Sequence, residues 1–155
     1  MTPTLHLLCG LPGSGKSTRA KELEAAGLGV LLNADEWVWR LYPEDAEAAA
    51  RDDRKGLIEH VQWELAERLL TSQVSIILDW GVWTRAERDH YRQRARDLGA
   101  SVQTKFLDAP IETLHARVAQ RNLDLPPGTF SISAEELDEW SALFEPPTHD
   151  ELITH

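Results

Sequence analysis

The chain contains one cysteine, Cys9, so it cannot form an intrachain disulfide. It has no apolar run close to the roughly 20 residues that span a membrane. Its first residues lack the charged start and long apolar stretch of a secretory signal peptide. These absences predict a protein of the reducing cytoplasm with no membrane partner. At 155 residues the chain is long enough for a proper core, and we expect one domain over residues 1–155.

Basic residues are missing from the C-terminal part of the chain. Residues 122–155 contain no Lys or Arg but eight acids, which account for most of the net charge of −10. Residues 1–121 carry a net charge of only −2. A broad positive surface for nucleic acid is therefore absent. A local basic groove is compatible with this composition, but we do not expect a nucleic-acid partner.

A phosphate-binding motif lies near the N-terminus. Residues 10–17 read GLPGSGKS and fit the P-loop pattern G-x-x-x-x-G-K-[ST]. Its glycines permit turns that aim backbone N–H groups at phosphates. Lys16 supplies a charge for the β- and γ-phosphates, and the Ser17 hydroxyl suits Mg²⁺. No guanine-reading Asn-Lys-x-Asp is present, so we expect ATP and Mg²⁺ as cofactors. The predicted nucleotide-binding residues are Gly10, Pro12, Gly13, Ser14, Gly15, Lys16, Ser17 and Thr18.

Strands and helices are expected to alternate along the chain. The apolar patterns predict strands at residues 5–9, 30–32, 74–78 and 102–107, and helices at 17–26, 35–42, 44–70, 84–98, 110–122 and 133–144. Capping boxes are predicted at residues 84–87 and 133–136. This order predicts a three-layer α/β fold with a parallel sheet and helices on both faces. Ligands then lie at the carboxyl ends of the strands. The Pro- and Gly-containing loop within about residues 122–132 is the predicted lid.

Two acids are expected at that edge of the sheet. Asp35 follows the second strand, from which a carboxylate can face the γ-phosphate across the crevice, so it is the candidate general base and an acceptor-binding residue. The alternative is that Asp35 only caps the next helix. Asp79 follows the third strand, where it is expected to bind Mg²⁺ or, alternatively, the acceptor.

Arginines occupy shared helix faces in two places. Arg117 and Arg121 are four residues apart and precede the predicted lid, so they are candidates to bind phosphates and stabilise transition-state charge. The alternative is that they are solvent-facing charges paired with acids. For Arg85, Arg88 and Arg92, which also share a face, we favour a solvated helix surface.

The chain has six tryptophans, and several follow the second and third strands. Trp37, Trp80 and Trp83 are predicted to wall an acceptor pocket suited to a flat or apolar body. Trp37 and Trp39 are two residues apart, so one helix face cannot hold both, and one of them is a candidate for the core. The other two tryptophans, Trp63 and Trp140, lie among apolar residues at helical spacing and are expected to pack internally.

These segments resemble a known group of enzymes. Residues 10–18, 33–35, 76–79 and 108–110, followed by Arg117 and Arg121, are similar in order and spacing to the P-loop kinase group that contains polynucleotide 5′-kinase, zeta toxins and chloramphenicol phosphotransferase. The resemblance covers about residues 4–122. It implies that Asp35 is the base and that Arg117 contacts the donor phosphates. Residues 79–88 and 144–148 resemble segments of proteins grouped as AAA-family ATPases.

One departure from the resemblance bears on the acceptor. Polynucleotide kinase has an arginine three residues after the base, and this chain has Val38 there. A small hydroxylated acceptor therefore fits better than a polynucleotide 5′-end. The sequence predicts an ATP-dependent phosphotransferase that acts on a small, aromatic or apolar-bodied acceptor. The alternatives are a polynucleotide 5′-hydroxyl kinase and a nucleotide-binding ATPase or switch without an organic acceptor.

Overall fold

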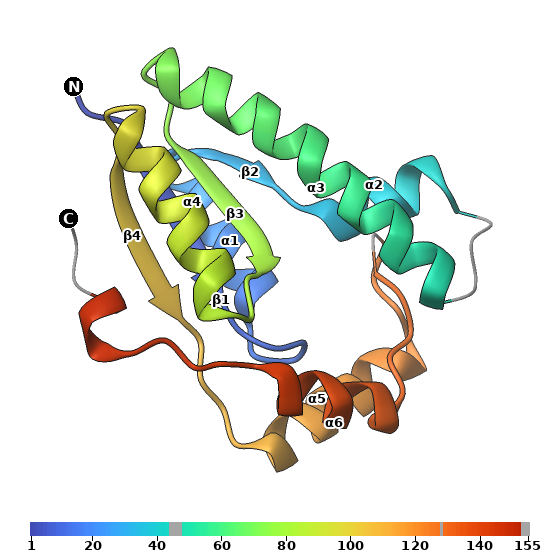
Figure 1. Ribbon diagram of the computed structural model, residues 1–155. Coiled ribbons are helices and arrows are strands. Elements are labelled where there is room, and N and C mark those ends of the chain that lie inside the picture. The colour runs from blue at the N-terminus through green and yellow to red at the C-terminus, as the bar shows by residue number, and fades with distance from the viewer. Residues whose placement is uncertain (44–47, 128, 153–155) are drawn as a thin grey trace.

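The computed structural model describes residues 1–43, 48–127 and 129–152 (Figure 1). Four parallel strands form one sheet in the order β2-β3-β1-β4. The strands are β1 (Thr4–Cys9), β2 (Val30–Leu32), β3 (Ile76–Gly81) and β4 (Ser101–Phe106). The two central strands, β1 and β3, are almost entirely buried, as their continuous apolar sequences predict.

Helices cover both faces of this sheet. The helices are α1 (Lys16–Ala25), α2 (Ala34–Leu41), α3 (Ala48–Thr71), α4 (Arg85–Asp97), α5 (Ile111–Leu123), α6 (Ala134–Leu143) and the short 3-10 helix η1 (His149–Leu152). In Figure 1, α3 and α4 lie over one face and α1 lies behind the other. The main core joins the sheet to α3 and α4, and a smaller core of Leu8, Ala20, Leu23 and Ile77 holds α1. The predicted three-layer α/β fold is therefore confirmed.

Some predicted boundaries lie outside the described residues, and the predicted end of the third strand differs from the structure. The predicted start of the third helix, Glu44, lies outside the described residues, and so does Gly128 of the predicted lid. Strand β3 runs to Gly81 rather than ending at Leu78, so Asp79 lies inside the strand and not after it. A polar residue is stable at this buried strand position because the Asp79 carboxylate pairs with Lys16 and accepts a hydrogen bond from Asn33.

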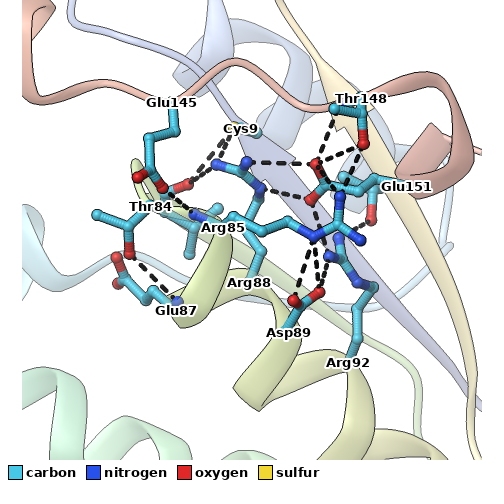
Figure 2. A network of polar contacts seen from close by, with 12 residues as sticks. Cys9, Thr84, Arg85, Glu87, Arg88, Asp89, Arg92, Glu145, Thr148 and Glu151 are labelled. Carbon is cyan, nitrogen blue, oxygen red and sulfur yellow. Dashed lines mark hydrogen bonds and ion pairs between the residues drawn. The ribbon is translucent and has the colours of Figure 1, made fainter.

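The prediction of a solvated surface is wrong for Arg88 and Arg92, which are both buried (Figure 2). Their partner is Glu151 of η1. Arg88 Nε lies 2.7 Å from one Glu151 carboxylate oxygen, and Arg92 Nη2 lies 2.8 Å from the same oxygen. We call these three residues the buried charge cluster. The shared helix face was predicted correctly, but the acidic C-terminal segment covers it. Arg85 remains partly exposed, where it contacts Asp89 and Asp150.

Candidate active site

The P-loop joins β1 to α1 and has the backbone that its glycines predict. Gly13 and Gly15 have φ angles of 85° and 93°, which side chains other than that of glycine resist. A Cβ atom at Gly13 would also lie 3.1 Å from the Leu114 carbonyl oxygen. Gly15 is the N-cap of α1, and Lys16 is its first helical residue. The free N–H groups of this helix end therefore lie where the motif requires a phosphate.

A chain of polar contacts connects the P-loop to the third helix. Lys16 Nζ forms an ion pair with Asp79, and Asn33 Nδ2 donates to the other Asp79 oxygen at 2.8 Å. The Asn33 carbonyl accepts from Gln62 Nε2 at 3.2 Å, and Gln62 Oε1 accepts from Trp80 Nε1 at 2.9 Å. The sequence analysis missed Asn33 and Gln62. Gln62 could have been found from the sequence, because it is a glutamine among apolar residues on the inner face of a helix.

Asp35 does not cap the second helix. Asn33 is the N-cap of α2, and its side-chain oxygen accepts from the Glu36 N–H at 2.9 Å. Asp35 instead lies 3.4 Å from the ammonium group of Lys55 on α3, another residue that the sequence analysis missed. Burial acts to raise the pKa of Asp35, but the charges of Lys55 and Lys16 outweigh it, so this pKa lies below its usual value. The carboxylate is therefore ionised at neutral pH.

A cavity of about 310 Å³ opens beside the P-loop, and we call it the acceptor cavity. It brings together Pro12 and Ser17 of the P-loop, Asp35, and Arg121 of α5. Aromatic walls come from distant parts of the chain, namely Trp80, Trp83, Phe130 and Trp140. Other charged lining residues are Arg51, Asp52, Lys55, Glu59, Glu87 and Glu136. This lining combines P-loop residues and charged side chains with an aromatic wall, a combination that is typical of a small-molecule site.

The tryptophans divide between this cavity and the core. Trp80 and Trp83 line the cavity. Trp37 is not among the lining residues and packs against the main core, so its predicted place in the acceptor pocket is wrong. Trp140 packs with Trp83, with ring centroids 5.5 Å apart, but it lines the cavity as well. Its apolar spacing alone could not reveal this second role.

The two predicted arginines of α5 take different positions. Arg117 is exposed and donates to the Gly13 carbonyl at 3.1 Å, at the edge of the P-loop. Arg121 lines the acceptor cavity, and Asp35 acts electrostatically on it. Within the described parts of the chain, Arg121 Nε and Ser14 Oγ are buried polar atoms without a partner. Two unpaired polar atoms around the P-loop fit a site that is completed by phosphate oxygens.

The loop that follows α5 closes part of this cavity. Residues 129–132 all line it. The loop is fastened at its base, because Asn122 Nδ2 donates to the Ile132 carbonyl at 2.6 Å and the Ile132 N–H donates to Asn122 Oδ1 at 3.1 Å. Residues 129–132 of the predicted lid therefore form part of the cavity wall, and the two ends of the loop are held together.

Two glutamates of the cavity were not singled out by the sequence analysis as site residues. Glu59 belongs to α3 and Glu87 to α4. The predicted capping box at Thr84 forms only in part. The Thr84 hydroxyl accepts from the Glu87 N–H at 3.2 Å, but no return bond from the Glu87 carboxylate exists among the described residues. The box at Ser133 and Glu136 is complete. The Glu87 carboxylate is thus left free to line the cavity.

A second cavity of about 180 Å³ lies on the other side of Leu11. Its lining includes Leu11, Phe106, Ala109, Phe144 and Pro146.

No cluster of three or more His, Cys, Asp or Glu side chains in the described residues could hold a metal by itself. No described helix is long and apolar enough to cross a membrane.

Several solved structures share this fold. A chain of the Pnkp1/Rnl/Hen1 RNA repair complex has 22% identity and a TM-score of 0.73, over 92% of this chain and 44% of that chain. Kti12 from Chaetomium thermophilum, in complex with ADP-AlF3, has 20% identity and a TM-score of 0.65, over 93% and 81% of the two chains. A gluconokinase from Sinorhizobium meliloti 1021 has 18% identity and a TM-score of 0.60, over 97% and 79%.

These likenesses establish the fold and leave the substrate open. The chain spans less than half of the RNA repair protein that it matches. No curated protein matches its sequence. A family model described as AAA domain matches residues 5–147, which is most of the chain. The protein therefore belongs to this AAA-domain family and has the fold of the P-loop kinases.

Proposed function

We propose that this protein is an ATP-dependent phosphotransferase that moves the γ-phosphate to a hydroxyl of a small acceptor. One observation carries the proposal. Asp35, freed from helix capping by Asn33, lines the same cavity as the P-loop residue Ser17 and as Arg121. A base, a phosphate-binding loop and a positive side chain around one small cavity are the parts that phosphoryl transfer to an alcohol needs.

Each side chain has a separate task in this reaction. The acceptor oxygen attacks the γ-phosphorus, the bond to the β-γ bridging oxygen breaks, ADP leaves, and Asp35 takes the hydroxyl proton. Lys16 and Arg121 stabilise the charge that gathers on the transferred oxygens. Arg117, which already contacts the P-loop backbone, adds positive charge at its outer edge. The lid segment excludes water and so limits hydrolysis of ATP.

Ser17 and Asp79 are the proposed residues for Mg²⁺, which neutralises phosphate charge when it is bound. Both Asp79 oxygens have protein partners, Lys16 and Asn33. The ion pair between Lys16 and Asp79 therefore holds the two side chains in place and must loosen when Lys16 turns to a phosphate. We propose that the adenine lies in the second cavity, between Leu11 and the Phe144–Pro146 segment, because most of the residues that line this cavity are of apolar type and it adjoins the P-loop.

A small acceptor is favoured over a polynucleotide end. Val38, which stands where polynucleotide kinase has an arginine, is buried and lines the acceptor cavity. The same cavity is covered by residues 129–132 and contains several acids, which repel a phosphate backbone.

The proposal is tested by a transfer screen with γ-labelled ATP against small alcohols, amino alcohols, nucleosides and 5′-hydroxyl oligonucleotides. The expected result is label on a small acceptor, with no transfer by Lys16→Ala and normal transfer by the surface control Lys21→Ala. Preferential labelling of oligonucleotides would support the polynucleotide alternative. ATP hydrolysis that no acceptor stimulates would support the nucleotide switch instead.

A further inference from the structure

Among the described residues, the acceptor cavity contains two half-buried carboxylates without a partner, and the exposed Asp52 at the same cavity has none either. No hydrogen bond or ion pair holds the side chain of Glu59 or Glu87 in the described ranges, residues 1–43, 48–127 and 129–152. Most other charged groups of the cavity are engaged within the protein. Asp35 pairs with Lys55, the Arg51 guanidinium lies 4.7 Å from the centre of the Phe130 ring, and Glu136 completes its capping box.

Lys55 exerts the strongest opposing charge on both carboxylates, but it does not pair with them. Its ammonium is held by Asp35 at 3.4 Å. Burial, with smaller contributions from the charges of Glu87 and Asp35, raises the pKa of Glu59 to about 7 against the opposing charge of Lys55. Burial also raises the pKa of Glu87, again against Lys55. Burial thus disfavours the ionised form of both acids, the charge of Glu87 adds to the effect on Glu59, and a cation placed beside them would relieve this penalty.

The walls around these acids suit an organic cation. Trp80, Trp83 and Trp140 present aromatic surface to the same cavity. Aromatic rings attract ammonium groups through their faces and also pack against the apolar part of a ligand. A metal ion is disfavoured, because no cluster of three His, Cys, Asp or Glu side chains exists in the described residues.

We propose that the acceptor is a small amino alcohol, whose protonated amine binds between Glu59 and Glu87 while its hydroxyl faces Asp35. This inference rests on the proposed function, since it names the substrate class of the same cavity. The distance expected between the amine and the hydroxyl of the acceptor follows from the positions of residues on α3. Glu59 and Lys55 are one helical turn apart on that helix, and Lys55 contacts Asp35. Side chains at this spacing have Cβ atoms roughly 5–6 Å apart, so the amine and hydroxyl must be separated by only a few bonds.

Binding of a matched pair of probes tests the proposal without any transfer reaction. Phenylethanolamine carries an amine and a hydroxyl on an aromatic body, and phenylethanediol has nearly the same size without the charge. We expect the amine to bind at least roughly tenfold more tightly, as measured by calorimetry and tryptophan fluorescence. Because binding favours the ionised glutamates, affinity should rise between about pH 6 and about pH 8, around the raised pKa of Glu59.

Variants of the two acids complete the experiment. Glu59→Gln and Glu87→Gln should each remove most of the preference for the amine. Glu64→Gln is the matched control, because Glu64 lies on the same helix but is exposed. Equal binding of amine and diol, no binding of either at millimolar concentration, or an unchanged preference in both variants would overturn the proposal. ATP binding is measured in parallel, so that failure of the phosphotransferase proposal is distinguished from failure of the cation site.

Discussion

Two groups of buried or half-buried charged side chains lie next to each other on α4. They differ in whether an opposite charge pairs with them. Arg88 and its neighbours in the buried charge cluster have opposite charges within hydrogen-bonding distance. Glu87, the preceding residue, lines the acceptor cavity without such a partner. A folded protein tolerates a buried charge when it is paired, as in the cluster. The half-buried Glu87 is the charge that we propose to bind a cation of the ligand, so this contrast separates the paired structural charges from the proposed binding charge.

The cluster also supports one wall of the cavity. Arg88 Nη1 donates to the carbonyls of Val82 at 2.9 Å and Trp83 at 3.1 Å (Figure 2). Val82 has a φ angle of 41°, which is strained for a β-branched residue, and it lines the cavity together with Trp83. The Glu145 N–H donates to the Trp83 carbonyl at 2.8 Å as well. The C-terminal segment therefore holds the loop after β3 in the conformation that shapes the acceptor site.

The largest effect is expected for a substitution in the acceptor cavity. Asp35→Asn keeps the size and polarity of the side chain but removes the proton acceptor. We expect it to lower the transfer rate by roughly 10²–10⁴-fold, the range for general acid–base catalysis. ATP affinity should change little, because Asp35 is not expected to contact the nucleotide. Steady-state kinetics and calorimetry measure the two effects, with Glu36→Gln on the same helix as control. A near-normal rate would exclude Asp35 as the base.

In the buried charge cluster, Glu151→Gln should mainly reduce the stability of the folded protein. The change leaves the buried Arg88 without an opposite charge and Arg92 with Asp89 alone, and breaking a buried pair in this way costs about 3–5 kcal/mol. The free energy of unfolding is measured in urea. Asp150→Asn is the control, since Asp150 is exposed, contacts only the partly exposed Arg85 and the Thr148 hydroxyl, and should change stability little. If both variants were equally stable, the cluster would not be the structural element that we describe.

The same carboxylate predicts how stability depends on pH. Burial would raise the pKa of Glu151, but hydrogen bonds from Arg88, the Thr148 N–H and Arg92 outweigh it and lower this pKa to about 2. Its contribution is therefore complete above the unfolded-state pKa of roughly 4.3, and it is lost as the pH falls toward 2. Acid unfolding curves should show a loss of about 3 kcal/mol over that window, absent in Glu151→Gln. The same acid sensitivity in both proteins would assign the effect to other groups.

Local patterns predicted the elements of the fold, and contacts between distant elements decided most of the errors. The P-loop, the strands and the Ser133 capping box follow from residues close in sequence. Arg88 and Arg92 were misread because their partner lies about sixty residues later, in a segment without helical or strand periodicity. Sequence spacing shows which residues share a helix face, but not what packs against that face.

The sequence analysis singled out some of the residues that line the acceptor cavity and missed those that belong to α3. Asp35, Trp80, Trp83 and Arg121 are candidates that the structure brings to this cavity. Lys55, Glu59 and Gln62 were not found, because polar residues on a long helix usually face solvent. Their inward position follows from the way α3 crosses the carboxyl edge of the sheet beside α2 (Figure 1).

The smallest effect is expected for Lys55. Its charge lines the acceptor cavity, as that of Glu87 does, but it is already paired, as the charges of the buried charge cluster are. Its positive charge lowers the pKa of Asp35. In Lys55→Met that pKa should rise, and since the ionised form of Asp35 is the active one, the acid limb of the pH–rate profile should move to higher pH. At the pH optimum the rate should fall less than in Asp35→Asn, because the base itself is intact. Lys21→Met, an exposed lysine of α1, is the control. A lower rate with an unmoved acid limb would mean that Lys55 acts on the phosphates or the acceptor rather than on the base.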